Sequence, residues 1–458
     1  MKTNFKIGIT ILIAIFSLIS CESFIEVDVP QSQLTGQAVF EDASTATAAL
    51  SNIYARLREE GMVTGSAFGL SNLMGNYADE LTFYGSNTVL QSFNNHTIIP
   101  SNSYIATLWN TSYGQLYAVN AIIEGVENTS NINAEDKNKL MGEALFIRAY
   151  IHFHLVNCFG EIPYITTTNY LQNTTVSKNT ISEINQNILN DLTNAEVLLL
   201  DNYPSDERVR ANKFVVKAML ARVHLYLENW TEAETYASEV INNASYNWEL
   251  NIQNVFLKEN PGIIWALHPG IAGLNTKDAR TFIFSSGPPI KQALSLDIMN
   301  AFEPNDTRKQ YWTRTITNGS QSWYHAYKYK KTLNTGTSEE YTILFRLAEQ
   351  YLIRAEARAE LNNPIQALED LNKVRTRAGL LESNATTTEE ILEAIIQERK
   401  VELFTEQGHR WFDLKRTGRA ENVLSPIKPN WQNTQLILPI PEAELLLNNN
   451  LSPQNPGY

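Results

Sequence analysis

The feature that most constrains the fold of this chain is a short helical motif that occurs three times. The three copies are Phe146-Ile147-Arg148-Ala149-Tyr150, Leu220-Ala221-Arg222-Val223-His224 and Leu352-Ile353-Arg354-Ala355-Glu356. After the second and third copies a polar corner follows, and a second amphipathic helix begins near Ala233 and near Ala367. Helix pairs of about 34 residues are typical of tetratricopeptide motifs. Small residues at the contact allow the two helices to pack closely. The sequence therefore predicts paired helices.

The repeats are not in tandem, because residues 246–340 separate the second copy from the third. This stretch is rich in Gly, Pro and aromatic residues and contains one apolar strand candidate at 262–267. A regular solenoid is thus excluded. We expect a mostly α fold, in which a tetratricopeptide-like helical-pair scaffold at about 38–245 and 341–458 carries a loop-rich insertion with short strands. Together these parts would form a single domain, 38–458.

The N-terminus has the pattern of an exported lipoprotein. Two lysines precede an uncharged apolar run at 7–19, which is too short for a comfortable membrane span. The run ends in Leu-Ile-Ser before Cys21, which resembles a bacterial lipobox. We predict a signal peptide at 1–20, lipid attachment at Cys21 and a tether at 21–37. The alternative is an ordinary signal peptide with a cysteine there by chance.

Composition excludes several classes of protein. The chain has 458 residues and a formal net charge of −13, which disfavours nucleic-acid binding and attachment to anionic lipid by basic patches. Two cysteines cannot form a disulfide framework or a four-cysteine zinc site. His152 and His154 are two positions apart on a predicted helix, so they face different directions. We expect no metal site, no cofactor and no catalytic motif.

Three glutamates near the C-terminus allow two interpretations. Residues 389–412 are predicted to be helical, which would place Glu398, Glu402 and Glu406 on one face. Two of these carboxylates could serve as a glycosidase pair. The favoured interpretation is a structural charge network with basic residues that are close in sequence. Those residues are Arg399, Arg410, Lys415 and Arg416.

Three motifs, in order, resemble the SusD/RagB family. The first is EALFIRAY at 143–150 followed by FGEIP at 159–163. The second combines QERKVELF at 397–404 with EQGHRWFDLKR at 406–416, and the third is LPIPEAEL at 438–445 with the final NPGY. One departure is Gln407, where members of the family often carry another residue before the glycine. The resemblance extends from Cys21 to Tyr458.

The resemblance implies a lipid-anchored protein at the cell surface of a Bacteroidetes-type outer membrane. Such proteins bind a nutrient, usually a glycan, and form a lid on a SusC-like TonB-dependent transporter; they are not enzymes. Two alternative functions are also binding functions: the protein could be a peptide-binding member of the family or a tetratricopeptide-type interaction scaffold. A third alternative, from a different class, is a surface glycoside hydrolase.

Aromatic residues beside amides are the candidates for a glycan site, because sugar rings stack on aromatic faces while their hydroxyls need polar partners. The family's ligand residues vary, so none can be transferred by motif. We expect Trp109, Trp230 and Trp265 to be structural, and the acidic chain favours a neutral glycan over a polyanionic one. The candidate ligand-binding residues are Trp312, Trp323, Tyr324, Tyr84, Phe83 and Asn87. The alternative for Trp312, Trp323 and Tyr324 is local core beneath long loops.

Overall fold

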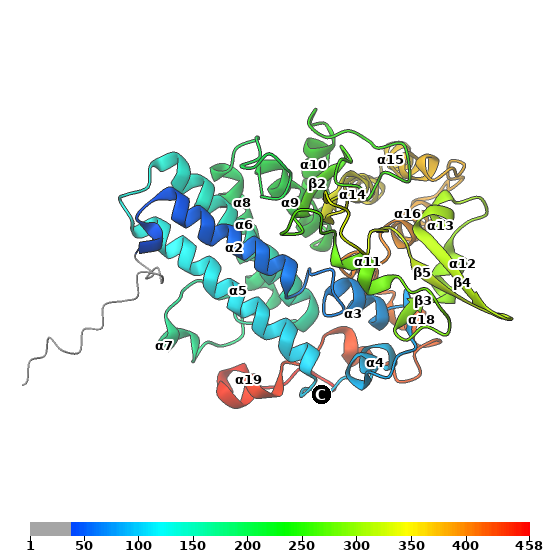
Figure 1. Cartoon of the computed structure of the whole chain (residues 1–458), viewed down its shortest axis with the longest axis horizontal. Helices are drawn as coiled ribbons and strands as arrows, with labels where there is room; N and C mark the ends of the chain where they lie inside the picture. The colour runs from blue at the N-terminus through cyan, green and yellow to red at the C-terminus, as the bar shows by residue number, and fades with distance from the viewer. Residues whose placement is uncertain (1–37) are drawn as a thin grey trace, which may run out of the picture.

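The computed structural model describes residues 38–458 (Figure 1). The predicted signal peptide, the lipid-attachment site Cys21 and the tether lie outside the described residues. The described chain is mostly α-helical with a few short strands, as the sequence predicted. No helix among residues 38–458 combines the length and apolar character needed to cross a membrane.

The N-terminal part is an array of long helices, seen on the left of Figure 1. Its long helices pack in succession, with α5 on α6, α6 on α8 and α8 on α9. Helix α8 begins with a capping box between Thr180 and Glu183, and its buried residues follow the helical spacing expected from the sequence. The elements are η2 (Ala38–Phe40), α2 (Ala43–Glu59), α3 (Leu70–Tyr77), β1 (Leu81–Phe83), α4 (Thr88–Asn95), α5 (Ser103–Asn128), α6 (Ala134–Phe159), α7 (Tyr170–Asn173), α8 (Ile181–Leu198), α9 (Lys213–Tyr226) and α10 (Trp230–Ile241).

The predicted helix pairs are present. Helix α9 packs on α10, and α14 (Leu347–Glu360) packs on α15 (Pro364–Arg377). Helix α10 also packs on α14, so the second and third repeats are neighbours in space although the insertion separates them in sequence. Ala221, Ala233 and Ala357 lie in one contact cluster, and Ala355 and Ala367 lie in another. All five side chains are fully buried, which explains why the contact positions are small.

The insertion contains more regular structure than the sequence suggested. The expected strand is present as β2 (Ile263–Leu267), with Trp265 buried in it. It pairs with β6 (Thr342–Arg346) from the other end of the insertion. Three short helices were not expected. The remaining elements are α11 (Lys277–Phe282), β3 (Gln292–Leu294), α12 (Leu296–Ala301), α13 (Thr307–Trp312), β4 (Thr313–Asn318) and β5 (Gln321–Ala326).

A second sheet joins the insertion to the N-terminal part. Its strand order is β1-β3-β5-β4, and the strands that pair are antiparallel. Strand β1 comes from the N-terminal part and pairs with β3, with Leu81 opposite Leu294. This pairing places the loop that follows β1 beside the loops of the insertion.

One prediction for the C-terminal part is wrong. The helix expected at 389–412 is interrupted: α16 (Thr388–Glu402) ends before Glu406, and α17 begins at His409. Thr405, Gln407 and Gly408 between them have positive φ angles, which a continuous helix does not allow. The other elements are α17 (His409–Arg416), α18 (Ala420–Leu424), η3 (Asn433–Leu436), α19 (Glu442–Leu447) and η4 (Asn449–Leu451).

Candidate functional site

Two surfaces of the molecule expose aromatic side chains. We call the first the loop face and define it by Phe68, Tyr84, Asn87, Tyr104 and Ile290. The second is a cavity that we call the aromatic pocket. The ligand residues predicted from the sequence lie on the loop face or in the insertion beside it, so we describe that face first.

Short contacts join the segments of the loop face. The backbone N–H of Tyr84 donates to the carbonyl of Lys291 at 3.1 Å, which brings Ile290 beside the loop after β1. The Asn87 amide donates to the Tyr104 hydroxyl at 2.9 Å, and the Tyr104 ring centroid is 4.7 Å from that of Phe68. Tyr84 is 46% exposed, Phe68 is 45% exposed and Ile290 is 88% exposed. Two rings are therefore available to a ligand on this face. The Asn87 amide also caps α4, because its oxygen accepts from the Leu90 backbone N–H at 3.0 Å, and it has one N–H and one lone pair left for a ligand.

Phe83 supports the loop face from below. Its half-buried ring packs against the main hydrophobic core. A Cβ at Gly85 would lie 2.6 Å from this ring and 2.8 Å from the carbonyl oxygen of Ile290. Only glycine permits this close approach, which fixes the path of the loop on which Tyr84 and Asn87 stand.

Trp312 is a core residue, in contrast to the sequence-based expectation. Its side chain is 1% exposed, and its indole N–H donates to the carbonyl of Ile252 at 2.9 Å. Phe256 meets it edge-on, with ring centroids 5.2 Å apart, and the Lys328 ammonium lies 5.2 Å from its ring centroid. With its surroundings filled in this way, the ring has no face left for a sugar.

Trp323 and Tyr324 on β5 are also largely covered. Trp323 is 8% exposed and forms a small cluster with Phe284 and Ala293. A Cβ at Gly287 would lie 2.2 Å from its ring, so the backbone of that loop rests directly on the indole. Tyr324 is half-buried against the second core cluster. Long-range contacts cover both Trp312 and Trp323, so the structure favours the alternative of local core beneath long loops for these two rings.

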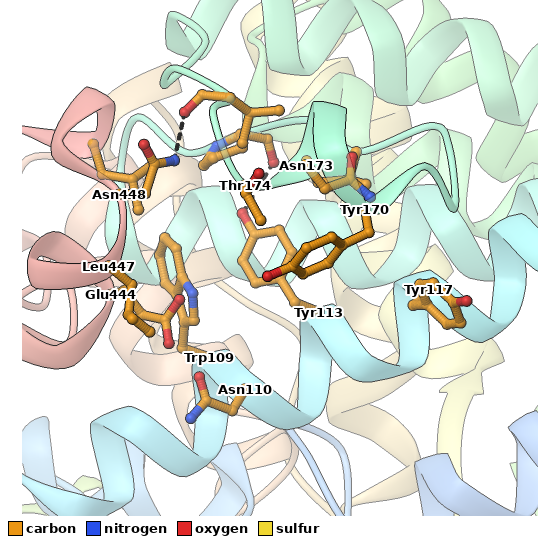
Figure 2. Close-up of a pocket in the computed structure, with 14 residues that line it drawn as sticks. Trp109, Asn110, Tyr113, Tyr117, Tyr170, Asn173, Thr174, Glu444, Leu447 and Asn448 are labelled. Atoms are coloured by element: carbon orange, nitrogen blue, oxygen red, sulfur yellow. Dashed lines mark hydrogen bonds between the residues drawn. The ribbon is translucent and has the colours of Figure 1, made fainter. Parts of the chain in front are cut away.

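The aromatic pocket has a volume of about 460 Å³ and lies between segments that are distant in sequence (Figure 2). Helix α5 contributes Trp109, Tyr113 and Tyr117 at spacings of four residues. Short helix α7 contributes Tyr170, and α19 contributes Glu444 and Leu447. The signal in the sequence was the spacing of the three rings on α5. No local pattern indicated that α7 and α19 meet these rings.

The floor of the aromatic pocket is formed by packed rings, whereas one wall is exposed. The Trp109 and Tyr113 ring centroids are 4.8 Å apart, and the Tyr113 hydroxyl donates to the carbonyl of Pro163 at 2.9 Å. Trp109 is 3% exposed, as expected for a structural residue, and also lines the cavity. Tyr170, by contrast, is 74% exposed. In Figure 2 its ring stands in front of Tyr113, and Glu444 points toward Trp109.

The three glutamates near the C-terminus form a buried charge network, which confirms the structural interpretation. Glu402 pairs with Arg308 at 3.0 Å and with Arg346 at 2.5 Å. Glu398 pairs with Arg308 at 2.5 Å. The other pairs of this network join Glu406 to Arg346 and Lys328, and Glu402 to Arg377.

The partners of these glutamates are not the basic residues expected from the sequence. Arg399 pairs with Asp413 at 2.8 Å, and Arg410 pairs with Asp79 at 2.7 Å. The pKa of Glu402 is lowered because three guanidinium groups outweigh its burial. A paired and buried carboxylate of this kind is not placed to act on a substrate. No group of His, Cys, Asp and Glu in the described part of the chain could hold a metal ion.

Comparison with known proteins identifies the family. A family model described as starch-binding and associating with the outer membrane matches residues 24–225, and a SusD family model matches residues 298–458. SusD-like protein P25 from Formosa agariphila is 27% identical over 95% of this chain and 95% of its own length.

Solved structures have the same fold. A SusD superfamily protein from Bacteroides vulgatus superposes with a TM-score of 0.81 at 23% identity, covering 91% of this chain and 99% of its own. Surface glycan-binding protein A from Bacteroides thetaiotaomicron, solved in complex with laminarihexaose, has a TM-score of 0.77 at 18% identity over 90% and 99% of the two chains. Two family models in succession, full-length relatives and a shared fold lead to one conclusion: the chain belongs to the SusD/RagB family.

Proposed function

We propose that this protein is a surface-exposed glycan-binding lipoprotein that captures an oligosaccharide or polysaccharide and delivers it to a SusC-like TonB-dependent transporter in the outer membrane. The observation that carries the proposal is the loop face, where Tyr84 and Phe68 expose their rings beside the Asn87 amide. The family of the chain supports it, as does the laminarihexaose complex of a protein with the same fold.

The chemistry of the loop face suits a sugar. An exposed aromatic ring offers a flat apolar surface to the C–H face of a pyranose, and the Asn87 amide keeps one N–H and one lone pair for a hydroxyl besides its bonds to Tyr104 and Leu90. Stacking depends little on the exact linkage, so a few rings can hold a long polymer and release it again. We expect dissociation constants in the micromolar to millimolar range, or about −8 to −4 kcal/mol.

The charges beside the loop face favour a neutral glycan. Lys291 follows Ile290, but its ammonium donates to the carbonyl of Arg280 at 2.5 Å. Burial lowers the pKa of this lysine, which further reduces its value as an anchor for an anion. The candidate ligand is therefore held by stacking and by neutral hydrogen bonds rather than by ion pairs.

The sequence supports two further parts of the proposal, the delivery of the glycan to the transporter and the lipid anchor. The lipobox at Cys21 supports attachment to the membrane by a lipid, and the family supports a SusC-like partner. A Cys21→Ala variant is expected to lose acylation. Metabolic labelling with palmitate tests this, and a labelled variant would contradict the lipid anchor.

The test of glycan binding is calorimetry with laminarihexaose and a panel of other neutral oligosaccharides. Tyr84→Ala or Phe68→Ala is expected to cost about 1–3 kcal/mol of binding free energy, as truncated aromatic hot spots do. Leu381→Ala is a matched control, because this side chain is 87% exposed and lies on the loop between α15 and α16. Unchanged affinity in the folded Tyr84→Ala, Phe68→Ala double variant would remove the loop face from the proposal.

A further inference from the structure

The rim of the aromatic pocket carries large apolar side chains that the structure leaves uncovered. Leu447 lines the pocket and is 80% exposed. On the opposite element, Tyr170 is exposed to a similar degree, and Tyr117 extends this surface along α5. Leu446 and Leu171, the sequence neighbours of Leu447 and Tyr170, are also exposed but do not line the cavity. Single exposed apolar residues are ordinary, but apolar side chains gathered around one cavity mark an interaction site (Figure 2).

The charged group that lines the aromatic pocket is anionic. Of the residues that line it, Glu444 is the charged one, and neither Lys nor Arg is among them. Burial raises the pKa of the Glu444 carboxyl, and the neighbouring Trp109 indole opposes this rise. Lys178 lies two positions beyond the lining residue Val176, but its ammonium donates to the carbonyl of Pro453 at 2.8 Å. The pocket thus has an anionic group without a cationic partner in its lining.

The exposed leucine and the carboxylate of the pocket favour a polypeptide over a neutral glycan. The Leu447 side chain offers no flat ring for a pyranose and no hydrogen bond for a hydroxyl, and it buries well against apolar side chains of another protein. The Glu444 carboxylate offers a partner for a cationic side chain, which a neutral glycan lacks.

We infer that the aromatic pocket is the docking site for an arginine side chain, flanked by apolar residues, on an exposed segment of a protein partner. The aliphatic stem lies on the rings of Tyr113 and Tyr170, and the guanidinium reaches Glu444. Arginine fits better than lysine because its planar head both stacks on aromatic rings and pairs with a carboxylate. The apolar flanks of the partner segment contact Tyr117 and Leu447.

This inference is independent of glycan binding at the loop face. The two surfaces share no lining residue: Tyr104 of the loop face and the ring residues of the pocket both stand on α5, but Tyr104 is not among the residues that line the cavity. The two proposals can therefore fail separately.

The experiment compares two blocked tripeptides by titration calorimetry on the full chain: acetyl-Leu-Arg-Leu amide, and the same peptide with uncharged citrulline in place of arginine. We expect the arginine peptide to bind about tenfold more tightly, from the ion pair and the cation–π contact together. Glu444→Gln removes the charge and keeps the shape, so it should reduce this ratio to near one. Tyr170→Ala should weaken binding of the arginine peptide about fivefold or more, and Leu381→Ala should change nothing.

Several results would overturn the inference. One is equal binding of the two peptides, and another is no saturation up to about 10 mM of the arginine peptide. Loss of laminarihexaose binding in Tyr170→Ala but not in Tyr84→Ala would make the pocket a glycan site. Dissociation of a dimer by Tyr170→Ala would make the occupant a second copy of the chain. Peptide binding that appears only after deletion of residues 22–37 would make it a segment of this chain.

Discussion

The helical pairs and the loop-rich insertion of this molecule both combine apolar packing with buried ion pairs, but they use them differently. In the pairs, alanines such as Ala221 and Ala355 are fully buried and let helices meet along repeating apolar faces, and an ion pair such as Arg354–Asp370 adds to this contact. The insertion has its own apolar cluster around Trp312, and buried ion pairs from Arg308 and Lys328 join it to α16 and the following turn. Irregular loops lack a repeating apolar face, so directional charge pairs contribute more to their position. The comparison teaches that a few buried polar contacts can orient an irregular surface on a helical scaffold.

The largest effect is expected where the loop-rich half is joined to α16. Glu402→Ala leaves Arg308, Arg346 and Arg377 with fewer buried partners, and breaking buried ion pairs in this way costs about 3–5 kcal/mol. The measurement is the free energy of unfolding in urea. Glu393→Ala is the matched control, because its pair with Arg419 is exposed and should be worth less than about 1 kcal/mol. Equal losses in the two variants would contradict the comparison.

A test on the helical pairs is overpacking. Ala355→Trp introduces a large ring where α14 is fully buried and should cost about 1–3 kcal/mol of stability, with a lower melting temperature. Glu360→Trp, on the exposed end of the same helix, should leave the melting temperature unchanged. Glycan affinity in the folded fraction should be unaffected, since Ala355 belongs to a cluster apart from the loop face. An unchanged melting temperature for Ala355→Trp would count against the paired-helix packing.

We expect the stability of the protein to depend on pH through Glu80, which lies at the junction between the two regions. Burial, followed by the charge of Asp79, raises the pKa of Glu80 to about 8, against the opposing charges of Lys328 and Arg410. The folded protein thus keeps a proton on this carboxyl that the unfolded chain loses near pH 4.5. The stability that Glu80 contributes is therefore present at low pH and is lost as pH rises through this window.

Glu80→Gln tests that sign, because the amide stays neutral. Its stability relative to the original protein should increase between about pH 4.5 and about pH 8, as measured by urea unfolding at each pH. A relative stability that stays constant across this pH range would mean that Glu80 is already ionised in the folded state.

The smallest effect concerns salt. Because the charges of the loop-rich half are paired inside the protein, and the loop face binds through rings and an amide, glycan affinity should hardly change from low to high ionic strength. Calorimetry in two salt concentrations measures this. A large loss of affinity at high salt would point to ion pairs with a charged glycan.

Some of the candidate site could be predicted from the sequence and some could not. Tyr84 and Asn87 stand on an exposed loop, where the mixture of ring and amide had placed them as candidates, and their role in binding remains a prediction. Trp312 and Trp323 looked equivalent to Tyr84 in the sequence, because all three lie in irregular, aromatic-rich segments. Their burial depends on Ile252 and Gly287, which no local pattern connects to them.

The sequence by itself determined the helices and their pairing, because both depend on patterns that recur within a few residues. Apolar residues at helical spacing, small residues at helix contacts and capping residues specify the helices and their pairs, because these signals act over a few positions of the chain. The tertiary structure alone decided which rings reach solvent, which arginines pair with Glu402, and that α5, α7 and α19 enclose a pocket. Exposure and ion pairing depend on contacts between residues that are distant in sequence, and these contacts exist only after the chain has folded.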